Sequence, residues 1–169
     1  MAKIDDKYQA KKVIVNTKST FTQLNRKIVS NYMELDLIKK EVYATDKPVL
    51  TIDDGSKGST LVKADDVMGY IDQELIKLNK NVYVKNVNEK KEEVVLTADR
   101  GTVTKQMADV YDRVKIVTKE SVTTANEGHY DMENRKIRAK GNVHVEYQTD
   151  KSAENVFDNM TATKKTTKK

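Results

Sequence analysis

Several residue types are missing or scarce in this chain of 169 residues. It has no cysteine and no tryptophan, only two phenylalanines and one proline. Without cysteine the fold has no disulfide framework and no thiolate chemistry, although such a protein can still reside in an oxidising compartment. No apolar run approaches the roughly 20 residues that a membrane-spanning helix needs, and no signal peptide is visible. These absences leave a polar chain of single-domain size.

The net charge of +5 comes mostly from the end of the chain. Residues 161–169 contain four lysines and no acidic residue, so 27 basic and 26 acidic residues remain elsewhere. A nucleic-acid surface would instead gather basic residues on a folded face, often between aromatic side chains. The sequence therefore predicts no nucleic-acid partner, and it predicts a basic, disordered tail over residues 159–169.

Three stretches of the chain share one pattern: residues 62–84, 96–116 and 123–145. Each opens on an apolar residue or Thr, has an Ala two positions later, crosses a polar turn and climbs through alternating apolar residues to a Val-x-Val or Val-x-Ile strand. Self-similarity at a period of roughly 20 to 50 residues is typical of stacked supersecondary units. The repeat therefore predicts an array of similar units that share one core.

The dominant period within each unit is two, as in residues 82–84, 114–116 and 143–145. Such alternation places one set of side chains in the core and the other in water, so it predicts strands. Residues 32–42 also fit an amphipathic helix, but we interpret them as strands that align with the repeat. Short, evenly spaced strands favour an all-β barrel, sandwich or jelly roll.

Aligning the units predicts columns of core residues. The columns are Ala64, Ala98 and Ala125; Leu78, Val110 and Ala139; Val82, Val114 and Val143; and Val84, Ile116 and Val145. For residues 32–42 the alignment places Ile38 with Leu78 and Val42 with Val82. The alanines leave interior space that a larger side chain would have filled.

Candidate catalytic and metal-binding residues are few. His129 and His144 lie on polar-facing positions, and no cysteine accompanies them, so exposed strand histidines are the simpler interpretation than a metal site. Asp65 and Asp99 recur with the repeat, which favours a structural role at turns over catalysis. No HExxH, glycine-rich phosphate loop or Ser-His-Asp order is present. The sequence therefore predicts neither an enzyme nor a cofactor.

The repeat resembles the OstA-like superfamily of lipopolysaccharide-transport proteins. The resemblance is carried by KGNVHV at residues 140–145, by Ala-Asp at 64–65 and 98–99, and by the strands at 47–51 and 81–84. The order of these pieces is similar to the periplasmic part of LptC, with LptA as a close second. The resemblance implies a twisted, V-shaped β-jelly roll built from repeated short antiparallel strands. We expect it over residues 21–158, after a flexible segment at 1–20.

The resemblance also implies a function. Such proteins relay lipopolysaccharide across the periplasm with the acyl chains inside the roll, and they join inner-membrane Lpt transporter components, other OstA-like proteins or further copies of themselves by edge-strand addition. An LptC-like protein would be held at the inner membrane by an N-terminal helix that this sequence lacks. The alternatives are a soluble LptA-like bridge and a structural or adhesive β-repeat module without a lipid. The expected lipid-binding residues are Ile76, Leu78, Val82, Val84, Val110, Val114, Ile116, Ile137, Val143 and Val145.

Overall fold

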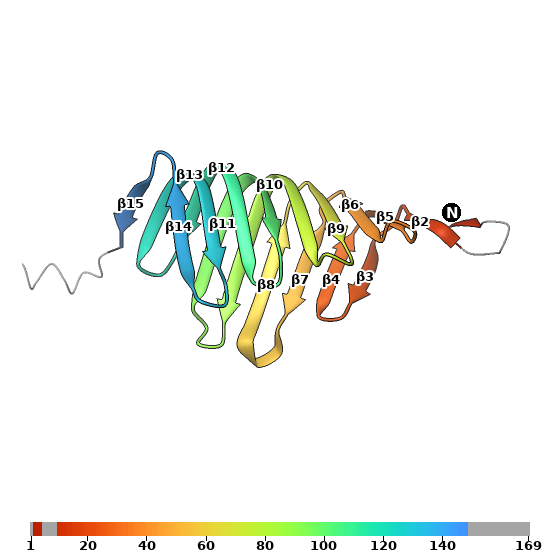
Figure 1. Cartoon of the computed structure of the whole chain (residues 1–169), viewed down its shortest axis with the longest axis horizontal. Helices are drawn as coiled ribbons and strands as arrows, with labels where there is room; N and C mark the ends of the chain where they lie inside the picture. The colour runs from red at the N-terminus through yellow and green to blue at the C-terminus, as the bar shows by residue number, and fades with distance from the viewer. Residues whose placement is uncertain (1, 5–9, 149–169) are drawn as a thin grey trace, which may run out of the picture.

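The protein is one continuous antiparallel sheet of fifteen strands (Figure 1). The computed structural model describes residues 2–4 and 10–148. The only helical element in these residues is a single 3₁₀ turn, η1 (Gly55–Lys57), and no described helix is long and apolar enough to cross a membrane. The predicted all-β fold class is confirmed.

The sheet is folded into two layers that share four long, bent strands. The shared strands are β10 (Leu75–Asn88), β11 (Glu93–Val103), β12 (Met107–Val117) and β13 (Ser121–Asp131). Layer A adds β1 (Ala2–Ile4), β2 (Ala10–Val15), β5 (Tyr32–Asp36), β6 (Glu41–Thr45), β9 (Asp66–Tyr70) and β14 (Lys136–Lys140). Layer B adds β3 (Ser19–Gln23), β4 (Arg26–Ser30), β7 (Val49–Asp53), β8 (Gly58–Lys63) and β15 (His144–Tyr147).

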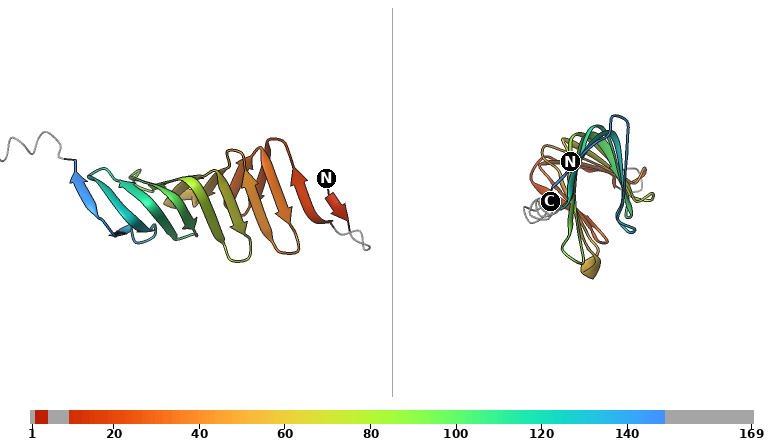
Figure 2. Two further views of the ribbon diagram at one scale, coloured as in Figure 1. Left: turned by 90° about the horizontal axis from the view of Figure 1, so that it is seen from above. Right: turned by 90° about the vertical axis from the view of Figure 1, so that its left-hand side faces the viewer.

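The pairing of the shared strands shows how the layers diverge. The first half of β10 pairs with β9, and its second half pairs with β8. Likewise the second half of β13 pairs with β14 and its first half with β15. Seen along the long axis, the two layers join at one side, which we call the corner, and part at the other (Figure 2). This is the V shape that the resemblance implied.

The corner is made by residue pairs with positive φ. Asp46-Lys47, Lys80-Asn81, Asp112-Arg113 and Gly141-Asn142 all have φ between 48° and 73°. Two successive left-handed residues turn an extended chain sharply, and the pairing register is interrupted at the pairs inside β10 and β12. Asn, Asp and Gly tolerate this conformation better than other residues. Each pair therefore carries the chain from one layer to the other.

A small residue followed by Asp or Asn faces each left-handed pair. The backbone N–H of Asp65 donates to the Lys80 carbonyl at 3.0 Å, and that of Asn126 donates to the Gly141 carbonyl at 2.8 Å. The Asp99 carboxylate accepts hydrogen bonds of 2.6–3.0 Å from Arg113, which holds the pKa of Asp99 below its usual value. The structural role predicted for Asp65 and Asp99 is confirmed.

The small residues of this column fill the corner rather than lining a space. Ala64, Ala98 and Ala125 are almost fully buried where the layers meet. Ser30, followed by Asn31, occupies the same place one unit earlier, and the Asn31 N–H is 3.5 Å from the Asp46 carbonyl. The prediction that these alanines leave interior space is wrong, because the layers are closest together at the corner.

Two further predictions differ from the structure. Residues 32–42 form two strands and the turn between them, as expected, but the alignment of this unit with the later units was shifted. The left-handed pair at 46–47 corresponds to the pair at 80–81. Ala44 therefore matches Leu78, and Ile38 lies exposed in a turn. The boundary at residue 21 falls inside β3, and β2 pairs with β5, so the sheet begins before the predicted domain start. The basic tail at 159–169 lies outside the described residues.

Gly58, at the start of β8, provides a stability test. Its φ is 127°, and a Cβ there would lie 2.1 Å from the Val87 carbonyl oxygen of the neighbouring β10. Gly58→Ala should lower the free energy of unfolding in urea by more than about 2 kcal/mol, because strained backbone and steric overlap add together. Gly55→Ala is the control: φ is also positive there but the space is open, so we expect a loss of about 1 kcal/mol. Equal losses would contradict the steric argument.

Candidate functional site: the interior of the roll

The interior of the roll is lined by apolar rows that run across the strands, along the long axis of the molecule. In layer B each member of the row is registered opposite the next. The row is Phe21, Ile28, Leu50, Val62, Val84, Leu96, Ile116, Thr123 and Val145. Since facing residues on one side of a sheet are in contact, this row forms a continuous strip across nine strands.

Layer A carries two such rows. One contains Leu35, Val42, Gly69, Ile76, Val103, Ala108, Tyr130 and Ile137, and the other contains Met33, Ala44, Val67, Leu78, Gly101, Val110, Gly128 and Ala139. The layers pack closely: a Cβ on Gly128 would lie 2.9 Å from the Val114 Cγ1 and 3.1 Å from the Ile116 Cδ1. The interior is therefore a packed apolar seam that extends over the length of the roll.

Seven of the ten expected lipid-binding residues are buried in this interior. They are Ile76, Leu78, Val82, Val84, Val110, Val114 and Ile116. The other three, Ile137, Val143 and Val145, are 36%, 48% and 41% exposed. They were expected in the same enclosed space, but Ile137 and Val145 lie on β14 and β15 and Val143 just before β15, at the end of the sheet in the part of the chain that the structure describes. Ile137 opposes Tyr130 and Val145 opposes Thr123, so the apolar rows reach the end of the roll uncovered.

A polar bridge crosses the apolar interior. Tyr130 of layer A, only 2% exposed, donates a hydrogen bond of 3.0 Å to the Asn86 Oδ1 in the layer B half of β10. Asn86 donates in turn to the Thr60 Oγ1 at 2.9 Å, and Thr60 lies 3.6 Å from the Met132 sulfur. Burial raises the pKa of Tyr130, which therefore remains a neutral donor at neutral pH. The bridge links the two layers at a point away from the corner.

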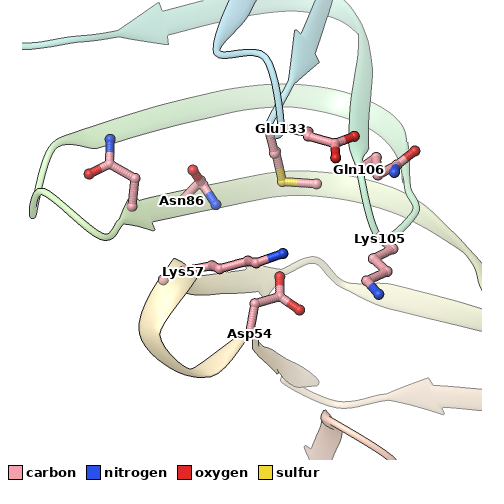
Figure 3. A pocket seen from close by; sticks show the side chains of 9 residues that line it. Asp54, Lys57, Asn86, Lys105, Gln106 and Glu133 are labelled. Atoms are coloured by element: carbon pink, nitrogen blue, oxygen red, sulfur yellow. The ribbon is translucent and has the colours of Figure 1, made fainter.

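The side opposite the corner, which we call the mouth, is lined by the turns of both layers. The layer A turns are 37–40, 71–74, 104–106 and 132–135, and the layer B turns are 24–25, 54–57, 89–92 and 118–120. A cavity of about 330 Å³ lies between them. Asp54, Lys57 and Asn86 line it from layer B, and Lys105, Gln106 and Glu133 line it from layer A (Figure 3). A polar vestibule thus stands above the polar bridge.

The two histidines considered as metal ligands, and two of the strand lysines, contact other side chains on the outer face of the sheet. The His129 Nδ1 lies 2.7 Å from an Asp109 oxygen, and the His144 Nε2 lies 3.2 Å from a Glu146 oxygen. No group of three or more potential metal ligands is gathered in residues 2–4 and 10–148. Lys85 pairs with Glu93 at 2.7 Å, and the Lys77 ammonium lies 5.0 Å from the Tyr70 ring centre. These contacts support the interpretation of a solvated outer face.

The bent two-layer sheet with its apolar seam has the β-jelly-roll fold of a solved lipopolysaccharide-transport protein. The crystal structure of LptH from Pseudomonas aeruginosa, described as the LptA-homologous periplasmic component of the lipopolysaccharide transport device, superposes with a TM-score of 0.65. The match covers 73% of this chain and 95% of LptH at 11% sequence identity, so it establishes the fold. No protein family and no curated protein matches the sequence.

Sequence reasoning missed the polar bridge. Thr60, Asn86 and Tyr130 each occupy an interior-facing position, but they are 26 and 44 residues apart along the chain. A buried tyrosine usually finds a partner for its hydroxyl group, so an inward-facing Tyr in an aliphatic row was a usable signal. Its partner could not be identified without the pairing register.

Removing the hydroxyl group of Tyr130 tests the bridge. Tyr130→Phe leaves the Asn86 oxygen without this donor, so we expect the free energy of unfolding to fall by about 1–2 kcal/mol. Tyr147, which is 77% exposed, is the control. Tyr147→Phe should change the free energy of unfolding by less than about 0.5 kcal/mol. Urea unfolding followed by circular dichroism measures both. Equal stability of the two variants would show that the bridge contributes nothing.

Proposed function

We propose that this protein is a non-enzymatic carrier of lipopolysaccharide in the periplasm. The observation that supports it best is the set of mainly apolar rows that run lengthwise through the roll and remain partly exposed at the last described strands. Acyl chains are long, apolar and flexible, so they fit a strip that is continuous along the molecule better than a closed pocket. The sugar and phosphate groups would remain in water.

The expected lipid-binding residues remain part of this proposal. Ile76, Leu78 and Val110 belong to the buried middle of the roll, and an acyl chain would separate the layers there. Ile137 and Val145 continue the interior rows on β14 and β15, and Val143 directly precedes β15. These residues would be the first to contact an incoming acyl chain, or the last to contact it before it moves to the next protein.

The edge strands support joining to neighbouring Lpt components. β14 and β15 each pair with β13 alone, and β3 pairs with β4 alone, within the described residues. An edge strand with free N–H and C=O groups can accept a strand from another chain. End-to-end joining would make the apolar rows of successive rolls continuous. An LptC-like and an LptA-like role both fit this arrangement.

A structural β-repeat module without a lipid is the second candidate. The close packing at Gly128 favours it, because the interior is filled with side chains. The exposed apolar residues Ile137 and Val145 favour the carrier, because they extend the apolar rows onto the last described strands.

Photo-crosslinking distinguishes the two candidates. Benzoylphenylalanine placed at Leu78, Ile137 or Val145 should form adducts with lipopolysaccharide, since these side chains line the interior rows. Neighbouring outward positions in the same strands, Lys77, Arg138 and Glu146, are matched controls. Adducts would be detected as shifted bands that react with an antibody to lipopolysaccharide.

The crosslinking test does not depend on the buried position alone. Ile137 and Val145 accept a bulky side chain without repacking the core, so their result stands even where the Leu78 variant is unstable. Absence of adducts at both of them, or adducts only at outward positions, would refute the carrier and leave the structural module.

A further inference from the structure

Two ion pairs join the layers across the mouth. The Arg26 guanidinium of layer B lies 3.3 Å from a Glu74 oxygen in the layer A turn 71–74. The Arg135 guanidinium of layer A lies 2.8 Å from a Glu92 oxygen in the layer B turn 89–92. The hydrogen bond from Asn88 lowers the pKa of Glu92, and the charge of Arg135 acts in the same direction. This carboxylate is therefore ionised at neutral pH.

Three cavities with shared lining residues lie near the Arg26–Glu74 pair and the vestibule. A narrow apolar crevice of about 20 Å³, with Phe21, Ile28 and Ile76 in its wall, shares Arg26 with a second cavity of about 140 Å³. The second cavity shares Lys105 with the vestibule of about 330 Å³ described above. Because neighbouring cavities share a lining residue, the three are adjacent, and we call the row that they form the slot.

The lining of the slot matches an amphiphile with an anionic head. At one end its wall includes members of the apolar rows, whereas the vestibule is polar. Lys57 and Lys105 enter the vestibule from opposite layers (Figure 3), and neither forms an ion pair within the described part of the chain. Asp54, in contrast, accepts a hydrogen bond of 2.8 Å from Asn25. Lys57 and Lys105 share the vestibule with the carboxylates of Asp54 and Glu133, and they are its cationic groups beside the cavities that lead to the apolar crevice.

The corner and the mouth differ in what holds the layers together. At the corner the layers are joined by the backbone of four continuous strands, whereas at the mouth we find only side-chain contacts among the described residues. Exposed ion pairs are weak and exchange readily with water. The mouth is therefore the side at which the layers can part while the sheet stays intact.

We propose that this slot is the opening through which an acyl chain enters the roll sideways, and that the Arg26–Glu74 and Arg135–Glu92 pairs hold it closed. The anionic head of the lipid rests between Lys57 and Lys105 while its chain passes between the layers. This inference rests on the proposed function, since it takes lipopolysaccharide as the ligand.

Tethering the mouth tests the opening. The chain has no cysteine, so the double variants Arg26→Cys/Glu74→Cys and Glu92→Cys/Arg135→Cys can be bridged specifically by a short bifunctional methanethiosulfonate reagent and released with dithiothreitol. Bridging should slow the association of fluorescent lipopolysaccharide by about tenfold or more, because the open state becomes rare. Release should restore the rate. The matched control is Lys40→Cys/Asp72→Cys, an ion pair of 2.8 Å between two turns of layer A, whose bridging should leave the rate unchanged.

The outcomes separate this inference from the proposed function. If the bridged mouth variants bind at the rate of the unbridged protein, chains enter from an end of the roll and the side opening is wrong, while the carrier stands. If the unmodified protein does not bind lipopolysaccharide at all, the carrier fails and the inference fails with it.

A second variant shifts the rate in the opposite direction. Arg26→Gln/Arg135→Gln removes both ion pairs and makes the mouth more negative. Electrostatic repulsion would slow the association of an anionic lipid, whereas loss of the closing contacts should accelerate it by a factor of roughly two to ten. Slower association would contradict the closing role of the two pairs.

Discussion

The rest of the structure depends on the backbone bend at the corner. Four left-handed residue pairs carry the chain from one layer to the other, and each is faced by a small residue and an Asp or Asn. Two of these pairs lie inside β10 and β12, and β11 and β13 also run through both layers, so the layers cannot separate at the corner without loss of the sheet. The bend also sets the register, and the register places each member of an interior row opposite the next member on the neighbouring strand.

The core columns that the sequence predicted are those whose positions are fixed relative to the bend. In the last three units the column positions two residues before each left-handed pair, and one and three residues after it, are aliphatic or Ala, so the alignment found them correctly. The earlier unit was misaligned because its left-handed pair is Asp46-Lys47 and the residues that face this pair are Ser30-Asn31, which replace the Ala-Asp or Ala-Asn of the later units. Left-handed conformation is shared by Lys-Asn, Asp-Arg, Gly-Asn and Asp-Lys, and these pairs have no common sequence pattern.

The site was predictable only where it depends on alternation. Inward-facing aliphatic residues were found from their period of two, but their exposure depends on where the sheet ends, which is why Ile137, Val143 and Val145 were misplaced. The contacts of the mouth join residues far apart in sequence: Arg26 and Glu74 are separated by 48 positions, and Glu92 and Arg135 by 43. Such turn-to-turn contacts depend on the curvature of the whole sheet, which no local pattern encodes.

The two sides of the roll therefore have opposite mechanical properties. The corner is closed by main-chain continuity, and the mouth by side chains that include the Tyr130–Asn86 bridge and two exposed ion pairs. A structural module gains nothing from such an asymmetry, since polar contacts in an apolar seam are weaker than the packing they replace. A carrier must exchange side-chain packing for lipid without unfolding. In the proposed carrier, hydrogen bonds and ion pairs that water can replace would allow this exchange at the mouth, while the bent strands preserve the fold at the corner.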